Sequence, residues 1–326
     1  MAGLSVDPFV ITLTMTPAVD VTIPVNTLQP GALHRVSSVR QDPGGKGINV
    51  AKALMAFHVP VVTTGLLGGE RGHWIADQLR KMGINQDFVF VDEETRLNVK
   101  ITEQDGRLSE FNALSPPVQT AQWQQIEERL AKAKSGQWVA LCGRLPEGVD
   151  QTGYQKAIVN AKQRGVKTLL DSSGQGFREG IKAGPDLVKP NREELSEWYG
   201  QPLVTQEQLV IGAHALLAYG VSYVVVSLGQ EGVLGVTKDA VFRVTVPKTE
   251  AVSSVGAGDS LVAGLLLGFY QQYPFAEVLR FGAAAGTAAV STPGTQQPSY
   301  EAVQTIALSI EVLKNVNHVD LDSGRN

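Results

Sequence analysis

Apolar runs and amphipathic segments alternate along most of the chain. Short apolar runs predict buried strands, and segments with apolar residues three or four positions apart predict helices. The predicted strand and helix pairs are 61–67 with 74–82, 138–142 with 154–164, and 167–171 with a short helix, and further strands are predicted at 186–189 and 222–227. Such alternation is typical of a parallel sheet covered by helices, with ligands at the carboxyl ends of its strands.

Two segments depart from this alternation. Residues 9–30 and 88–112 show period-two patterning, and Asp105-Gly106 predicts a hairpin turn in the second segment. We expect a small antiparallel β lid formed by about residues 9–35 and 88–114. Because no low-complexity tract or long linker separates the two segments from the rest, we expect one domain over residues 1–326.

The C-terminal part of the pattern differs again. After residue 259 the chain is predicted to be nearly all helical, apart from a turn at 292–295. Residues 320–326 are mostly polar and are expected to be frayed.

Composition narrows the class of protein. The chain has 326 residues, is 43% hydrophobic and carries a net charge of −4, so it can bury a substantial core and lacks the basic character of nucleic-acid-binding proteins. Cys142 is the single cysteine, which excludes an internal disulfide and fits a reducing compartment. The apolar run 261–269 is shorter than the roughly 20 residues that cross a bilayer. We therefore expect a cytoplasmic protein with no membrane partner.

Residues 253–260, Ser-Ser-Val-Gly-Ala-Gly-Asp-Ser, predict a glycine-rich turn at a helix start. Gly256 and Gly258 allow backbone N–H groups to converge, and the helix dipole adds positive potential, so the turn predicts an anion site. Asp259 would repel a phosphate unless it takes a proton from an attacking hydroxyl, as a kinase's general base does. The alternative interpretation is an ordinary helix N-cap. The dinucleotide-binding fingerprint needs a third glycine at position 261, where this chain has Leu261. The segment therefore does not match that fingerprint.

A second glycine-rich turn, at residues 43–47, opens a predicted helix. Three glycines surround Lys46, which indicates a backbone pressed against a small polar ligand, and Asn49 can both donate to and accept from sugar hydroxyls. Lys46 could meet a phosphate. The alternative is a simple turn that carries a solvated lysine.

Together these motifs resemble those of the ribokinase-like carbohydrate kinases, in particular the phosphofructokinase B branch. Five motifs occur in the family's order, at 16–20, 44–49, 189–194, 227–232 and 256–259. The resemblance implies a three-layer α/β/α fold with a central, mostly parallel sheet and a small antiparallel β lid. Residues 95–103, with Asp105-Gly106 and 110–112, are more similar to the bacterial 1-phosphofructokinases than to the tagatose-6-phosphate kinases.

The resemblance also implies a reaction and its residues. Asp259 would deprotonate the C6 hydroxyl of fructose 1-phosphate, which attacks the γ-phosphoryl group of ATP to give fructose 1,6-bisphosphate, while the amides of Gly256, Ala257 and Gly258 hold the developing charge. Asp20, Gly44, Gly45 and Asn49 match the family's sugar-binding positions, and Arg96 and Lys46 suit the substrate's own phosphate. The residues matching the nucleotide-binding positions are Lys189, Asn191, Ser227, Gly229, Gly232 and Gly258.

Several alternatives remain open at this point. Glu194, in an N-x-x-E element with Asn191, is implied to act indirectly on Mg²⁺, but the alternative is a first-turn carboxylate favoured by the helix dipole. Arg144 stands where relatives commonly have a serine. Its two alternative roles are a second ligand of a phosphate and a solvated loop residue. Tagatose-6-phosphate kinase and fructose-6-phosphate kinase are the alternative activities, and a sugar-phosphate-binding regulatory relative is the non-enzymatic one. Apolar alternation in the lid predicts a homodimer joined through the lids.

Overall fold

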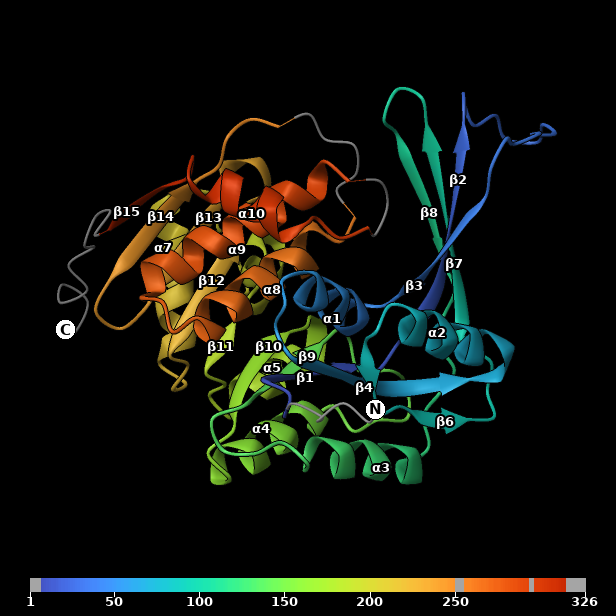
Figure 1. The fold of residues 1–326 in the computed structure, drawn as a ribbon. Helices are drawn as coiled ribbons and strands as arrows, with labels where there is room; N and C mark the ends of the chain where they lie inside the picture. Colours follow the sequence, from blue (N-terminus) through green and yellow to red (C-terminus); the bar gives the residue numbers. More distant parts are fainter. Residues whose placement is uncertain (1–6, 250–254, 293–295, 315–326) are drawn as a thin grey trace.

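A computed structural model describes residues 7–249, 255–292 and 296–314. Its framework is an 11-stranded sheet in the order β15-β14-β13-β12-β11-β10-β9-β1-β4-β5, with β6 paired to β4 (Figure 1). In chain order its strands are β1 (Val10–Thr14), β4 (Val61–Gly68), β5 (Asn85–Gln86), β6 (Val89–Val91), β9 (Trp138–Cys142), β10 (Lys167–Asp171), β11 (Leu187–Val188), β12 (Tyr223–Ser227), β13 (Val233–Val236), β14 (Val241–Thr245) and β15 (Glu311–Lys314).

The sheet is mostly parallel, as predicted. All pairings from β5 to β12 are parallel, whereas β13, β14 and β15 add an antiparallel edge. The predicted strands at 138–142 and 167–171 coincide with β9 and β10. β15 is a strand in the region that we predicted to be nearly all helical. Part of the predicted turn at 292–295 and all of the predicted frayed segment lie outside the described residues.

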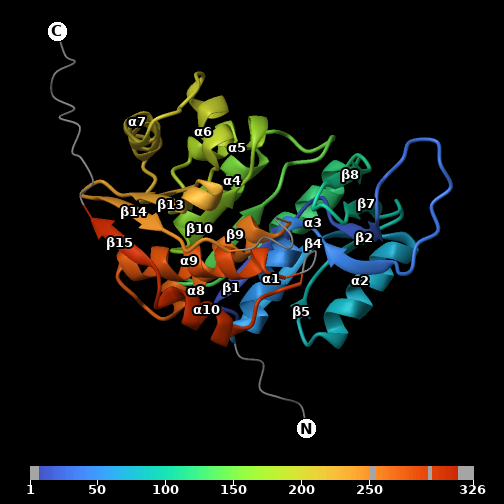
Figure 2. The same ribbon diagram turned by 90° about the horizontal axis from the view of Figure 1, so that it is seen from above.

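Helices cover both faces of the sheet, which gives the three expected layers (Figure 2). One face carries α1 (Lys46–Ala56), α2 (Gly69–Lys81), α8 (Ala257–Tyr270), α9 (Phe275–Val290) and α10 (Tyr300–Ala307). The other carries α3 (Thr120–Leu130), α4 (Gly153–Gln163), α5 (Gly174–Ile181), α6 (Arg192–Tyr199) and α7 (Gln206–Leu217). Strand side chains alternate between the two cores, so Val139 and Leu141 face one layer and Ala140 the other.

A separate four-stranded sheet projects from the body as a lid (Figure 1). Its strands are β2 (Ala18–Val25), β3 (Arg40–Gly44), β7 (Arg96–Glu103) and β8 (Leu108–Asn112), in the order β3-β2-β7-β8. The hairpin predicted at Asp105-Gly106 joins β7 to β8, and Gly106 has a φ of 87°. The outer pairings are antiparallel, but β2 and β7 in the centre are parallel.

The predicted start of the lid near residue 9 is wrong. β1 lies in the middle of the large sheet between β4 and β9, so Val10 and Leu13 are fully buried core residues. All five of its residues, including Thr12 and Thr14, are buried, as is typical of a parallel strand covered on both faces. β3 is a lid strand that the sequence analysis missed, because Arg40–Gly44 has no apolar alternation.

The lid has one apolar face and one polar face. Val19 and Val21 are buried in the same core as α1 and α2, and their register partners Leu97 and Val99 pack against that core. Side chains at alternate positions point the other way, which places Asp20 on the opposite face. The polar face therefore presents a buried carboxylate at the base of the lid.

Candidate active site

Two helix starts and three strand ends meet at one place. β1, β9 and β10 end level with one another, since Thr14 pairs with Cys142 and Cys142 with Asp171. α1 and α8 pack against each other and begin beside these strand ends. The caps that precede them, Gly45 and Gly256, have φ values of 120° and 78°, which glycine adopts without strain. This is the edge of a parallel sheet where α/β proteins bind ligands.

Asp259 lies in the first turn of α8 and is buried. One carboxylate oxygen, Oδ2, accepts a hydrogen bond of 2.9 Å from Asn49 Nδ2 of α1. Burial, together with Asp171, raises the pKa of Asp259 to about 6, although Lys46, Asn49 and Lys189 act in the opposite direction. A carboxylate in this pKa range is ionised at neutral pH and is a stronger base than an exposed aspartate.

Asp171, at the end of β10, holds two lysines beside Asp259. Its Oδ1 lies 3.2 Å from Lys46 Nζ and 3.3 Å from Lys189 Nζ. Burial alone would raise the pKa of Asp171, but the two lysines outweigh it and keep the pKa below its ordinary value. Sequence analysis did not assign Asp171 to the site. The signal was present, because it is the polar residue at the carboxyl end of a predicted central strand.

Lys46 lies beside Asp171, and its charge also interacts with Asp259 and Glu194. Burial would lower its pKa, but Asp171, Asp259 and Glu194 raise it above the ordinary lysine value, so Lys46 stays charged. Arg96, at the start of β7, instead donates to the carbonyl oxygens of Thr16 and Ala113 at 3.1 and 3.0 Å. In the structure, Lys46 contacts a carboxylate and Arg96 contacts two backbone carbonyl oxygens.

The glycines of the turn at residues 43–47 bring the chain close to its own strands. A Cβ on Gly44 would lie 2.5 Å from Asp20 Oδ2, and a Cβ on Gly47 would lie 2.4 Å from the carbonyl oxygen of Leu13. Such distances leave no room for a side chain. The close approach predicted from these glycines is thus made, at least in part, to β1 and β2 of the protein itself.

At the base of the lid, Asp20 is held by two residues of β7 that the sequence analysis did not assign to the site. Asn98 Nδ2 donates to one Asp20 oxygen at 2.9 Å, and Lys100 Nζ to the other at 2.9 Å. All three side chains are buried. The alternation of Asn98 and Lys100 along β7 can be seen in the sequence. The pairing of β7 with β2, which brings them to Asp20, cannot.

The predicted nucleotide-binding residues lie next to this cluster. Lys189 follows β11, and an added Cβ on Gly258 would lie 3.9 Å from its Nζ. Asn191 forms an isolated bridge with Ser227. Beyond them, η1 (Gly229–Glu231) begins at Gly229 with a φ of 59° and is followed by Gly232 with a φ of 92°. Ser253 and Ser254 of the glycine-rich segment 253–260 lie outside the described residues.

Two residues with open roles have structural contacts. Asn191 and Glu194 form a capping box at the start of α6. Glu194 Oε2 accepts a hydrogen bond from the backbone N–H of Asn191 at 2.9 Å, and Asn191 Oδ1 accepts one from the backbone N–H of Glu194 at 2.7 Å. This is the helix-start role that we gave as the alternative for Glu194. Arg144 is exposed, and its Nε donates to Ser173 Oγ at 2.7 Å.

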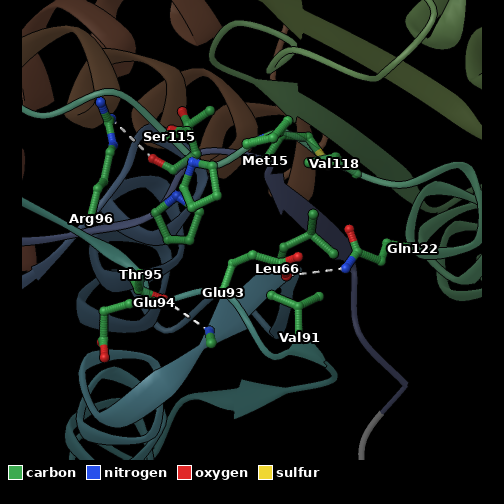
Figure 3. Close-up of a pocket in the computed structure, with 15 residues that line it drawn as sticks. Met15, Leu66, Val91, Glu93, Glu94, Thr95, Arg96, Ser115, Val118 and Gln122 are labelled. Carbon is green, nitrogen blue, oxygen red and sulfur yellow. Dashed lines mark hydrogen bonds between the residues drawn. The ribbon is translucent and has the colours of Figure 1, made fainter.

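Two cavities lie outside this constellation. A cavity of about 30 Å³ under the lid is bordered by Arg96 and by the hydrogen-bonded pair Glu93 and Gln122 (Figure 3). A cavity of about 340 Å³ includes Pro8 and Ile11 at the amino end of β1, and its charged walls include ion pairs such as Lys134 with Asp7. Asp259 lines neither cavity, whereas Arg96 lines the first.

No helix within residues 7–249, 255–292 and 296–314 combines the length and apolar character that crossing a membrane requires.

Comparison with known proteins agrees with this arrangement. The family model for pfkB family carbohydrate kinases matches residues 10–302, and the chain belongs to that family. It is 38% identical to the 1-phosphofructokinase of Haemophilus influenzae, over 86% of this chain and 91% of that protein. It is 35% identical to the 1-phosphofructokinase of Bacillus subtilis, over 85% and 91% respectively.

A solved structure shows the same fold. The phosphofructokinase-2 of Escherichia coli in complex with substrates and products superimposes with a TM-score of 0.88 at 30% sequence identity, over 92% of this chain and 98% of that one. The chain is therefore a phosphotransferase of the ribokinase-like fold, as the motifs predicted.

Proposed function

We propose that this protein phosphorylates the C6 hydroxyl of fructose 1-phosphate with ATP to give fructose 1,6-bisphosphate. The observation that carries the proposal is the buried carboxylate of Asp259 at the start of α8, beside two lysines that share Asp171. Relatives that match most of the chain are 1-phosphofructokinases, which supports this sugar phosphate as the substrate.

In the proposed reaction, Asp259 Oδ1 takes the proton from the C6 hydroxyl, because Oδ2 is already occupied by Asn49. The hydroxyl oxygen then forms a bond to the γ-phosphorus of ATP as the bond to the β–γ bridging oxygen breaks. Amides of Gly256, Ala257 and Gly258 at the start of α8, with Lys46 and Lys189, stabilise the charge on the transferred group. Gly44, Gly45, Asn49 and Asp20 face the sugar, and Arg96 binds its phosphate.

ATP and Mg²⁺ are part of the proposal. Lys189, Asn191, Ser227, Gly229 and Gly232 are proposed to line the nucleotide site. Among the described residues, no three His, Cys, Asp or Glu side chains gather in the manner of a metal site. That fits Mg²⁺, which is commonly held by substrate phosphates and one or two carboxylates. Asp171 Oδ2 is buried without a hydrogen-bond partner, and Glu194 is the second candidate carboxylate. Mg²⁺ would neutralise charge on the phosphates.

Substrate identity is tested by initial rates with ATP and each of fructose 1-phosphate, tagatose 6-phosphate and fructose 6-phosphate. We expect kcat/KM to be highest for fructose 1-phosphate by roughly tenfold or more, because a site that pairs its polar groups with one substrate leaves them unpaired with another. A higher value for either 6-phosphate would replace the proposed substrate. ATP turnover that no sugar phosphate stimulates would favour the regulatory relative.

We also propose a homodimer joined through the lids, in the cytoplasm. Apolar side chains remain exposed on β8 and on the connection between β2 and β3, including Phe111 at 59% and Leu33 at 78%. Phe111 pairs with Val99 and so extends the apolar lid face beyond its contact with the body. A second copy would cover this face, since exposed apolar patches mark contact surfaces.

Light scattering at micromolar concentration tests this assembly. We expect a mass near twice the 34.9 kDa of one chain. Phe111→Ser should shift the mass toward the monomer, whereas Val204→Ser, which changes an exposed apolar residue before α7, should not. A mass near 34.9 kDa for the unmodified protein would reject the dimer.

A further inference from the structure

Lys52 of α1 is a buried lysine that the proposed reaction does not yet use. It lies one helical turn after Asn49, and its Nζ lies 3.4 Å from Asn49 Oδ1 and 3.2 Å from the carbonyl oxygen of Pro43. Buried lysines are rare because the charged form loses hydration. Lys52 contacts Asn49, which in turn donates to Asp259, and this indicates a role beyond packing.

The two contacts of Asn49 fix which way its amide points. Ionised Asp259 can only accept, so the Asn49 atom 2.9 Å from Asp259 Oδ2 must be the donor Nδ2. The amide oxygen then faces Lys52, which can only donate when charged. A flipped amide would place two acceptors together at Asp259 and two donors together at Lys52. Lys52 and Asp259 thus select the same orientation of Asn49 from opposite sides.

We propose that Lys52 is a positioning residue that acts through Asn49, locking its amide so that it donates to Asp259 Oδ2 and leaves Oδ1 to accept the substrate proton. The proposal rests on the kinase reaction above, in which Asp259 is the base. Lys52 itself need not touch the substrate. It forms the far end of a hydrogen-bonded chain from Lys52 through Asn49 to Asp259.

Charges from three other elements face Lys52. Burial lowers its pKa to about 8; Asp42, Asp20 and Asp259 raise the pKa, and Arg40 lowers it. Asp42 and Arg40 lie on β3, Asp20 on β2 and Asp259 on α8. Lys52 is therefore mostly charged at neutral pH, and its interaction with Asp259 is reciprocal. Loss of the Lys52 charge should make the protonated form of Asp259 more favourable.

The test is the pH dependence of kcat/KM in Lys52→Met, which has a similar length but neither charge nor donor. We expect kcat to fall roughly tenfold to a hundredfold, the usual cost of losing a supporting hydrogen bond to a functional group. We also expect the acid limb of the profile, set by Asp259, to move to higher pH by roughly half a unit or more. Lys52→Arg keeps the charge and should leave the acid limb in place. Lys81→Met, on the exposed end of α2, is the matched control with no expected change.

A double-mutant cycle separates this role from packing. If Lys52 acts through Asn49, Lys52→Met should cost little further activity in an Asn49→Ala background. Fully additive losses, or an unmoved acid limb in Lys52→Met, would overturn the proposal. If Lys52→Met does not fold, Lys52→Gln removes the charge but keeps a donor, and it should still move the acid limb to higher pH. All rates are measured with whichever sugar phosphate the unmodified protein turns over best, so an error in the proposed substrate leaves this test intact.

Discussion

Asp259→Asn is expected to lower kcat by roughly 100-fold or more, because an amide cannot take the proton from the attacking hydroxyl. The substitution is nearly isosteric and removes a charge from a buried position, so the fold and the KM for ATP should change little. Steady-state kinetics together with a thermal melt check both statements. The unmodified enzyme should lose kcat/KM as the pH falls through about 6, the value to which burial raises the pKa of Asp259.

The matched control for this substitution is Asp239→Asn, which removes the same charge from an exposed residue in the turn between β13 and β14. It should leave kcat unchanged. If a folded Asp259→Asn protein kept near-normal kcat, Asp259 would not be the base. The carboxylate would then be a first-turn residue favoured by the dipole of α8, whose N-cap is Gly256.

Lys46→Met is expected to lower kcat by roughly 100-fold, the usual loss when one preorganised donor to a developing charge is removed. The reason is its position, since Lys46 shares Asp171 with Lys189 and lies in the field of Asp259. The KM for the sugar phosphate should change much less than kcat, because Arg96 is proposed to bind that phosphate.

Lys46→Arg is the second variant to measure. It keeps the positive charge, so it should recover part of the kcat that Lys46→Met loses. The opposite pattern, in which the sugar-phosphate KM rises while kcat is kept, would return Lys46 to the role that we first predicted from sequence. The two outcomes therefore decide which phosphate Lys46 serves.

The sequence predicted the body of the protein well and the lid less well. β9 and β10 were predicted at their observed bounds because each is a short, strand-like segment with an apolar centre, followed by an amphipathic helix. β1 has the same apolar character, but it was joined to the lid because it directly precedes β2 in the chain. Only the long-range pairing of β1 with β4 and β9 decides its place, and a local pattern does not carry that information.

The same limit explains what was missed in the site. Asp259, Gly256 and Asn49 belong to compact motifs and were found, whereas Asp171 meets Lys46 and Lys189 only after the strands are assembled. Lys100 reaches Asp20 across 80 positions of sequence. Charged residues far apart in the chain come together because of the register in which their strands pair. The spacing of residues along the sequence does not give that register.

The parallel pairing of β2 with β7 also has a consequence for the order in which the molecule assembles. An antiparallel lid could form from one local hairpin, but this pairing joins residues such as Asp20 and Asn98, 78 positions apart. The intervening chain supplies α1, β4 and α2. Closing so long a loop is entropically costly, so the centre of the lid should not form early as an independent local hairpin. The sugar side of the proposed site therefore depends on long-range pairing and not on a local hairpin.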